Sequence, residues 1–262
     1  MRIRRLTLGL ALACGSLIAG CDEEGGALLY VFSTHHATPE DGVFPDRGGE
    51  DMPRVFDNDM GWTVTLLETY VTINSLTVVG CDGTAYPLEM FWGPCPESMR
   101  EEDLDILTVG GRKMPEGNYC ELVVGYGPYA TPDVEPEDQD TRHNIPANAD
   151  IDGSTVYING GASTGVDGEE PIEFELTNSR DLTVELDLSN LGGPGKPLHI
   201  GAEEAFPKEL TVSKTYDRYF DGVDFTTLDT DEVEDHLDNV LRDSTRVQEG
   251  PVVKMFDPDD EG

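Results

Sequence analysis

Two adjacent histidines, His35 and His36, are the side chains of this sequence best suited to metal chemistry. They follow residues 28–32, a short apolar segment typical of a β-strand. Imidazole is a good ligand for copper and zinc, but two neighbouring histidines need a third ligand from elsewhere in the chain. We therefore predict that His35 and His36 are metal ligands, with His143 and His199 as candidates to complete the site. The alternative is a polar pair that begins a loop.

The abundant acidic residues make calcium a second candidate cofactor, because this cation prefers carboxylate and carbonyl oxygens. Asp57, Asn58 and Asp59 begin like an EF-hand loop, and Glu68 stands at the twelfth position. Trp62, however, occupies the position where that loop needs glycine. Residues 150–153 form a similar fragment without a closing acid. Copper and calcium both remain candidate cofactors, and Asx-type turns are the alternative interpretation of these acids.

Residues 161–165 match the GxSxG pattern of serine hydrolases. That chemistry needs the serine on a sharp turn between a strand and a helix. Here a second strand pattern follows, which favours a hairpin loop instead. No Ser, His and Asp set and no carboxylate pair can be localised from the sequence. We predict that the protein is not an enzyme and rank an exported hydrolase below a binding or structural protein.

The first 21 residues have the pattern of a bacterial lipoprotein signal. Arg2, Arg4 and Arg5 precede the apolar run 6–18, and residues 17–21 read Leu-Ile-Ala-Gly-Cys. This closing pentapeptide resembles the lipobox, in which the cysteine is lipidated and becomes the new N-terminus. We predict a signal peptide over residues 1–20, a lipid on Cys21 and a tether over residues 21–27. The expected location is the bacterial cell envelope, on the inner or outer membrane and facing the periplasm or the exterior.

Export changes how the remaining cysteines are interpreted, because oxidising compartments favour disulfides. Cys81 ends one strand pattern and Cys120 lies inside another. A bridge between them would close a loop of about 40 residues and contribute roughly 3 to 4 kcal/mol in the chain-entropy model. We prefer this pair and keep Cys81 with Cys95 as the alternative.

The charge balance excludes one class of partner. With 53 acidic and 17 basic side chains, the formal net charge is −36. Such a field repels DNA, RNA and other polyanions, so we predict no nucleic-acid partner. Neutral or cationic partners fit better. The partner could be a protein or a small cation, and the predicted lipid anchor adds the membrane.

Short blocks with period-two alternation dominate the chain and predict an all-β protein. The predicted strands cover residues 28–34, 62–74, 76–81, 106–109, 119–126, 155–159, 172–178, 182–188 and 209–214. So many strands with few helical intervals favour an antiparallel sandwich or barrel. Residues 127–153 predict a long loop, and residues 230–243 an amphipathic helix. We predict one domain over residues 28–250 and an acidic tail over residues 251–262.

The order of these elements resembles that of the copper-binding protein family associated with methanobactin. The resemblance rests on residues 62–66, the element 115–120, and residues 219–225 followed by a helix. It implies an immunoglobulin-like β-sandwich without enzymatic activity. In some members it further implies copper held by histidines near an oxidised tryptophan. Carried over to this chain, His35 and His36 would be the ligands, and Trp62 or Trp92 the aromatic residue.

The sequence therefore predicts a lipid-anchored extracytoplasmic binding protein, with copper or another divalent cation as its candidate ligand. The alternative is a structural or adhesion lipoprotein of the cell surface that holds no metal.

Overall fold

The computed structural model describes residues 26–45, 49, 51–130, 151–165, 170–202, 205–228 and 230–252. Within them the strands are β1 (Ala27–His36), β2 (Arg54–Asp57), β3 (Thr63–Gly80), β4 (Ala85–Pro87), β5 (Glu89–Met90), β6 (Cys95–Ser98), β7 (Leu107–Met114), β8 (Gly117–Tyr126), β9 (Val156–Ser163), β10 (Ile172–Asn178), β11 (Leu182–Asp187), β12 (Leu198–Ile200), β13 (Lys208–Thr215) and β14 (Arg246–Glu249). The helical elements are η1 (Tyr216–Arg218), η2 (Phe225–Thr227) and α2 (Thr230–Ser244). The predicted signal peptide, Cys21, most of the tether, His143 and the end of the acidic tail lie outside the described residues.

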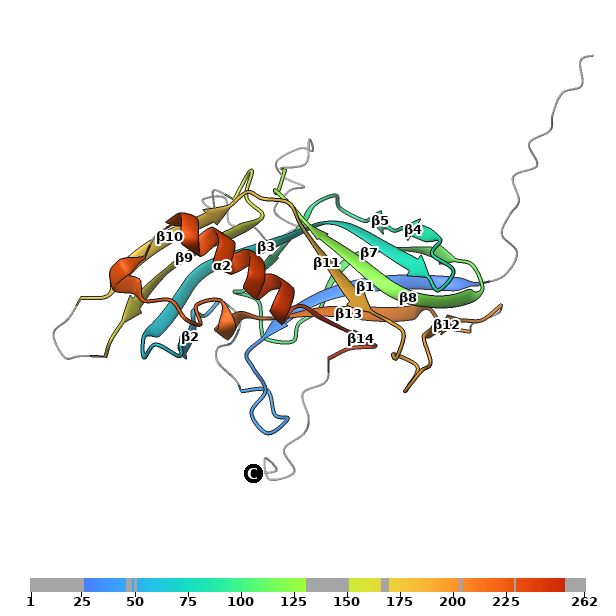
Figure 1. The fold of residues 1–262 in the computed structure, drawn as a ribbon, viewed down its shortest axis with the longest axis horizontal. Helices are drawn as coiled ribbons and strands as arrows, with labels where there is room; N and C mark the ends of the chain where they lie inside the picture. The colour runs from blue at the N-terminus through green and yellow to red at the C-terminus, as the bar shows by residue number, and fades with distance from the viewer. Residues whose placement is uncertain are drawn as a thin grey trace, which may run out of the picture.

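The described strands form two sheets, which confirms the all-β, sandwich-like prediction (Figure 1). The smaller sheet has the order β14-β13-β1-β7-β5. The larger has the order β10-β9-β3-β8-β11, with β12 paired to β8 and with β2, β4 and β6 paired to β3. The strand pairs are antiparallel except one: β1 runs parallel to β13, from Leu29 beside Lys208 to His36 beside Thr215. This parallel pair was not predicted.

Strand β3 is the central element of the larger sheet. Its first half pairs with β9 and its second half with β8, and the register shifts between Ile73 and Ser75. The sequence predicted two strands, 62–74 and 76–81, with a break at Ser75. The structure corrects this to one long strand, because an irregularity in the ladder accommodates Ser75 without ending the strand.

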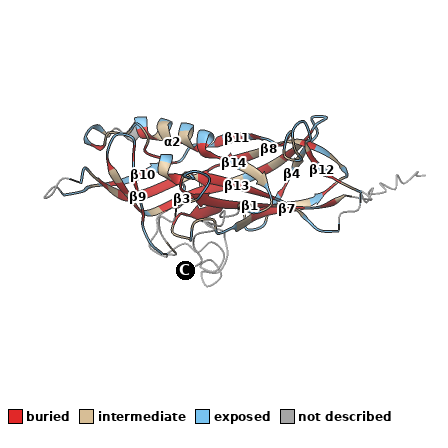
Figure 2. Cartoon of the chain, turned by 90° about the horizontal axis from the view of Figure 1, so that it is seen from below, coloured by how far each residue is buried: buried red, intermediate tan, exposed pale blue. Residues whose placement is uncertain are grey.

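The core fills the space between the sheets, where Figure 2 shows the buried residues in red. Leu29 and Val31 enter it from β1, and Val64 and Val124 from the opposite sheet. Helix α2 matches its predicted position and packs against β10, β13 and η1. Its buried side chains are Val233, Leu237 and Leu241, which belong to the predicted apolar stripe. Among the described residues, no helix has the length and hydropathy of a membrane span.

Candidate functional site

His35 points inward from β1 into a closed polar network. Its side chain is 1% exposed; its Nδ1 lies 3.0 Å from Glu97 Oε1 and its Nε2 3.1 Å from the carbonyl oxygen of Glu101. Both partners are hydrogen-bond acceptors, so each ring nitrogen faces an acceptor of this network.

The same network pairs a carboxylate with an ammonium group inside the core. Lys214 of β13 is fully buried, and its Nζ lies 2.5 Å from Glu97 Oε2 and 2.6 Å from Ser33 Oγ. Ser33 also donates its hydroxyl to Glu97. Strands β1, β6 and β13 therefore meet at one carboxylate whose oxygens all have partners. A buried ion pair survives only with such hydrogen bonding, because each charge loses its hydration.

A second, partly buried ion pair adjoins the first. Arg54 is 1% exposed and donates from Nε to Asp103 Oδ1 at 2.9 Å. The Tyr216 hydroxyl donates to Asp103 Oδ2 at 2.7 Å, and His35 Nε2 lies 3.8 Å from Asp103 Oδ1. Burial, together with the Asp103 carboxylate, raises the pKa of Tyr216. These contacts hold the loop after β6 against β1 and η1, and we assign the network a structural role.

Stability in acid depends on Glu97. Burial alone would raise the pKa of its carboxyl, but the Lys214 ammonium and the contact with His35 outweigh burial and lower this pKa to about 2. The carboxylate thus stabilises the fold above its unfolded pKa, and this stabilisation is lost as the pH falls from about 4.5 to about 2. Because one pKa unit corresponds to about 1.4 kcal/mol, we expect a loss on the order of 3 kcal/mol across this window.

Urea unfolding of the parent and of Glu97→Gln at several pH values, from about 2 to about 5, measures this contribution. Glu97→Gln should be less stable than the parent at the upper end of the pH range, and the difference in unfolding free energy should vanish towards the lower end. If the two plots of unfolding free energy against pH run parallel, the loss in acid does not come from Glu97, since other carboxylates titrate equally in both proteins.

The other predicted histidines do not join His35. His36, the next residue of the strand, has its side chain on the opposite face, where its Nδ1 donates to the carbonyl oxygen of Ala37 at 2.8 Å. Burial lowers the pKa of His36, and its ring lies against Phe44. His199 is exposed on β12 and bonds Asn118 Oδ1 at 2.9 Å. His143 lies outside the described residues.

The described part of the chain holds no group of three or more His, Cys, Asp or Glu side chains arranged for a metal ion. The geometry thus gives the histidine pair no common site, and its role as a metal ligand stays a prediction. The two tryptophans suggested by the family resemblance also differ in their surroundings. Trp62 is buried and packs edge-to-face against Phe225, whereas Trp92 is 46% exposed.

The side chains of residues 57–59, proposed for calcium, make hydrogen bonds within the chain. Asn58 Oδ1 accepts from the backbone nitrogens of Met60 and Trp62, and Asp57 accepts from the Thr63 hydroxyl. Glu68 lies in β3 beside Arg100, away from that turn. The Asx-turn alternative accounts for Asn58. Calcium binding by this segment stays a prediction.

The preferred disulfide is present. Cys81, just after β3, is bonded to Cys120 of β8, with 4.9 Å between their Cα atoms. The alternative partner, Cys95, is a free thiol buried at the start of β6. Burial, with Glu97 nearby, raises the pKa of Cys95 to about 12 and keeps the thiol protonated. Cys95 is therefore an unreactive core residue.

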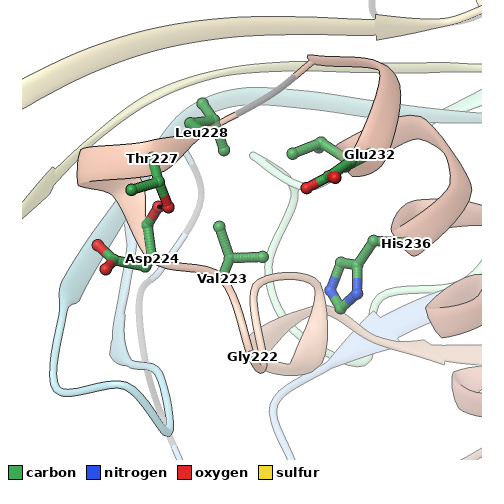
Figure 3. A pocket seen from close by; sticks show the side chains of 8 residues that line it. Gly222, Val223, Asp224, Thr227, Leu228, Glu232 and His236 are labelled. Atoms are coloured by element: carbon green, nitrogen blue, oxygen red, sulfur yellow. Dashed lines mark hydrogen bonds between the residues drawn. The ribbon is translucent and has the colours of Figure 1, made fainter.

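A pocket with a volume of about 260 Å³ opens between η2 and the start of α2 (Figure 3). Val223, Leu228 and Val233 provide apolar walls. Glu232 and His236 line one side from successive turns of α2, since residues four apart share a helix face. We did not predict this pocket from the sequence, although the Glu-x-x-x-His spacing on an amphipathic helix was a signal for it.

The pocket has one unsatisfied nitrogen and an excess of negative charge. Within the described residues, His236 Nε2 is buried without a hydrogen-bond partner. Burial raises the pKa of Asp221, next to the pocket, and the nearby Asp59 carboxylate raises it further. Asp224 lines the opposite side, where the Thr226 hydroxyl and backbone nitrogen lower the pKa of its carboxyl. The site thus offers a carboxylate and an imidazole nitrogen to a cationic group.

Comparisons with known proteins give a fold likeness only. No family model matches the sequence, and no curated protein sequence matches it significantly. Among solved structures, the chain is similar to MbnP from Methylosinus trichosporium, with a TM-score of 0.36 and 10% sequence identity. The match covers 72% of this chain and 76% of that chain.

Proposed function

We propose that this protein is a lipid-anchored extracytoplasmic binding protein that holds a small organic cation in the pocket between η2 and α2. The observation that carries the binding role is the buried, unpartnered Nε2 of His236 beside the Glu232 carboxylate. An ammonium group carries several N–H donors and one positive charge. It would satisfy both acceptors, while Val223, Leu228 and Val233 would cover an alkyl chain.

The location is supported by two features. The lipobox-like residues 17–21 predict a lipid on Cys21, and the Cys81–Cys120 disulfide is the bond expected in an oxidising compartment. The charge of −36 favours a cationic ligand, because it raises the local concentration of positive ions.

Titration calorimetry with 1,4-diaminobutane tests the binding role on the purified lipoprotein in neutral detergent. We expect saturable binding whose dissociation constant rises about tenfold or more in Glu232→Gln, equivalent to about 1.4 kcal/mol. Asp243→Asn removes one negative charge from the same helix outside the pocket and should change the constant less than about twofold. Equal effects of the two variants would reduce the interaction to general charge attraction and contradict a site.

Copper(II) is the second ligand to test, because imidazole binds it well. Elemental analysis after exposure to copper, followed by gel filtration, distinguishes two sites. Copper lost in His236→Leu would assign a metal to the α2 pocket in place of the organic cation. Copper retained there but lost in His36→Ala would instead favour the predicted histidine pair.

A further inference from the structure

An exposed apolar cluster involves the first residues of β1, a strand that begins at the right-hand end of Figure 1. It comprises Leu28 and Tyr30 of β1 and Phe91 and Trp92 after β5, and we call these four residues the aromatic cluster. Leu28, Phe91 and Trp92 are 45%, 39% and 46% exposed. Isolated exposed apolar residues need no explanation, but here Tyr30 contacts Phe91, Leu28 lies two residues before Tyr30, and Trp92 directly follows Phe91. Exposed apolar residues grouped in this way indicate an interaction surface.

The cluster is built into the sheet. The Tyr30 and Phe91 rings lie edge-to-face, with 6.0 Å between their centroids. Gly111 of β7 stands opposite Tyr30, and a Cβ there would lie 2.8 Å from Tyr30 Cδ1 and 3.3 Å from Phe91 Cζ. The absence of a side chain at Gly111 therefore lets both rings pack onto the sheet surface.

A basic residue and another exposed aromatic ring accompany the cluster. Lys113 is exposed and pairs with Leu28 across the strands, which places both side chains on one face. Phe206, 81% exposed, lies just before β13, which runs beside β1. Aromatic rings with a lysine are the composition of protein surfaces at the boundary between lipid and water. Lys113 is notable in a chain with only 17 basic residues.

The predicted lipid lies within reach of this face. Leu28 is the seventh residue after Cys21, and a fully extended chain over those seven steps spans at most about 25 Å. The headgroup layer of a bilayer is itself about 5 to 8 Å thick on each side. The anchor thus confines the aromatic cluster to the neighbourhood of the membrane surface.

We propose that the aromatic cluster docks on the lipid–water interface of the membrane that holds the Cys21 anchor. This inference rests on the lipid-anchor part of the proposed function. Docking would turn the solvent face of β1, which carries Leu28 and Tyr30, towards the membrane.

Fluorescence quenching by brominated phosphatidylcholine tests the proposal on the full-length, processed lipoprotein in vesicles. The chain has two tryptophans, and Trp62 is buried, so a Trp62→Phe variant reports on Trp92 alone. We expect bromine close to the headgroups to reduce Trp92 emission by about half, since tryptophan at a membrane surface sits at headgroup level. Emission of Trp62 in Trp92→Phe should not change.

Aspartate variants provide the matched control. In the Trp62→Phe background, Leu28→Asp should abolish the quenching, whereas Leu67→Asp, at a comparably exposed leucine of β3, should leave it intact. Flotation of the protein with the vesicles shows separately whether the lipid anchor attaches it to the membrane. A floating protein without Trp92 quenching, or with quenching unaffected by Leu28→Asp, would overturn the docking proposal and leave the anchor standing. A protein that does not float would overturn both.

Discussion

Replacing Lys214 with methionine should remove a large part of the free energy that holds the protein folded. The substitution takes the cation out of the buried pair and leaves the Glu97 carboxylate in the core with only Ser33 and His35 as side-chain partners. Breaking a buried ion pair from one side costs about 3 to 5 kcal/mol, because the remaining charge stays dehydrated. Urea unfolding at neutral pH should show a loss of this size.

A second lysine of β13 provides the control variant. Lys208 also lies on β13 and pairs with Glu249 at 3.1 Å, but both side chains are partly exposed. Lys208→Met should cost less than about 1 kcal/mol, because water solvates both partners of such a pair. Adding Glu97→Leu to Lys214→Met should recover part of the loss, since no unpaired charge then remains. Equal losses in the two methionine variants would show that burial of the network has no energetic consequence.

The second large effect concerns the disulfide. Reduction, or the double variant Cys81→Ala/Cys120→Ala, should lower the free energy of unfolding by roughly 3 to 4 kcal/mol, because a loop of 39 residues is no longer closed in the unfolded chain. Cys81 is exposed, so dithiothreitol reaches the bond. Urea unfolding with and without dithiothreitol measures the difference.

A Cys95 variant shows whether the effect belongs to this disulfide alone. Dithiothreitol should not change the stability of Cys81→Ala/Cys120→Ala. It should lower the stability of Cys95→Ala as much as that of the parent, since the Cys95 thiol forms no disulfide. Loss of the response in Cys95→Ala would instead support the alternative pair of Cys81 with Cys95.

Much of the fold could be predicted because its longer elements have strong local patterns. Residues 172–178 alternate strictly, and the predicted strand coincides with β10. The stripe in residues 230–243 has the period of a helix and packs as α2. The pairing of Cys81 with Cys120 followed from their places on two strong strand patterns.

The missing elements are short and have little pattern. Strand β6 reads Cys-Pro-Glu-Ser, and a proline and a glutamate disfavour a strand assignment, yet β3 pairs with all four residues. Glu97 lies on β6, so its contact with His35 could not be expected. The sequence singled out His35 as a candidate metal ligand, but the contacts of its side chain depend on partners 62 and more residues away. The α2 pocket likewise requires η2 and α2 to be placed in three dimensions.

The parallel pairing of β1 with β13 has a consequence for how the chain reaches its compartment. Ser33 and Lys214, which the pairing brings together, are separated by 181 residues. Closing such a distant contact is slow and comes late, because the entropy of a long loop must be overcome first. The smaller sheet therefore cannot be completed until β13 is available. If the predicted signal peptide exports the chain from its N-terminus, this delay would keep the precursor unfolded and competent for translocation until most of the chain has crossed.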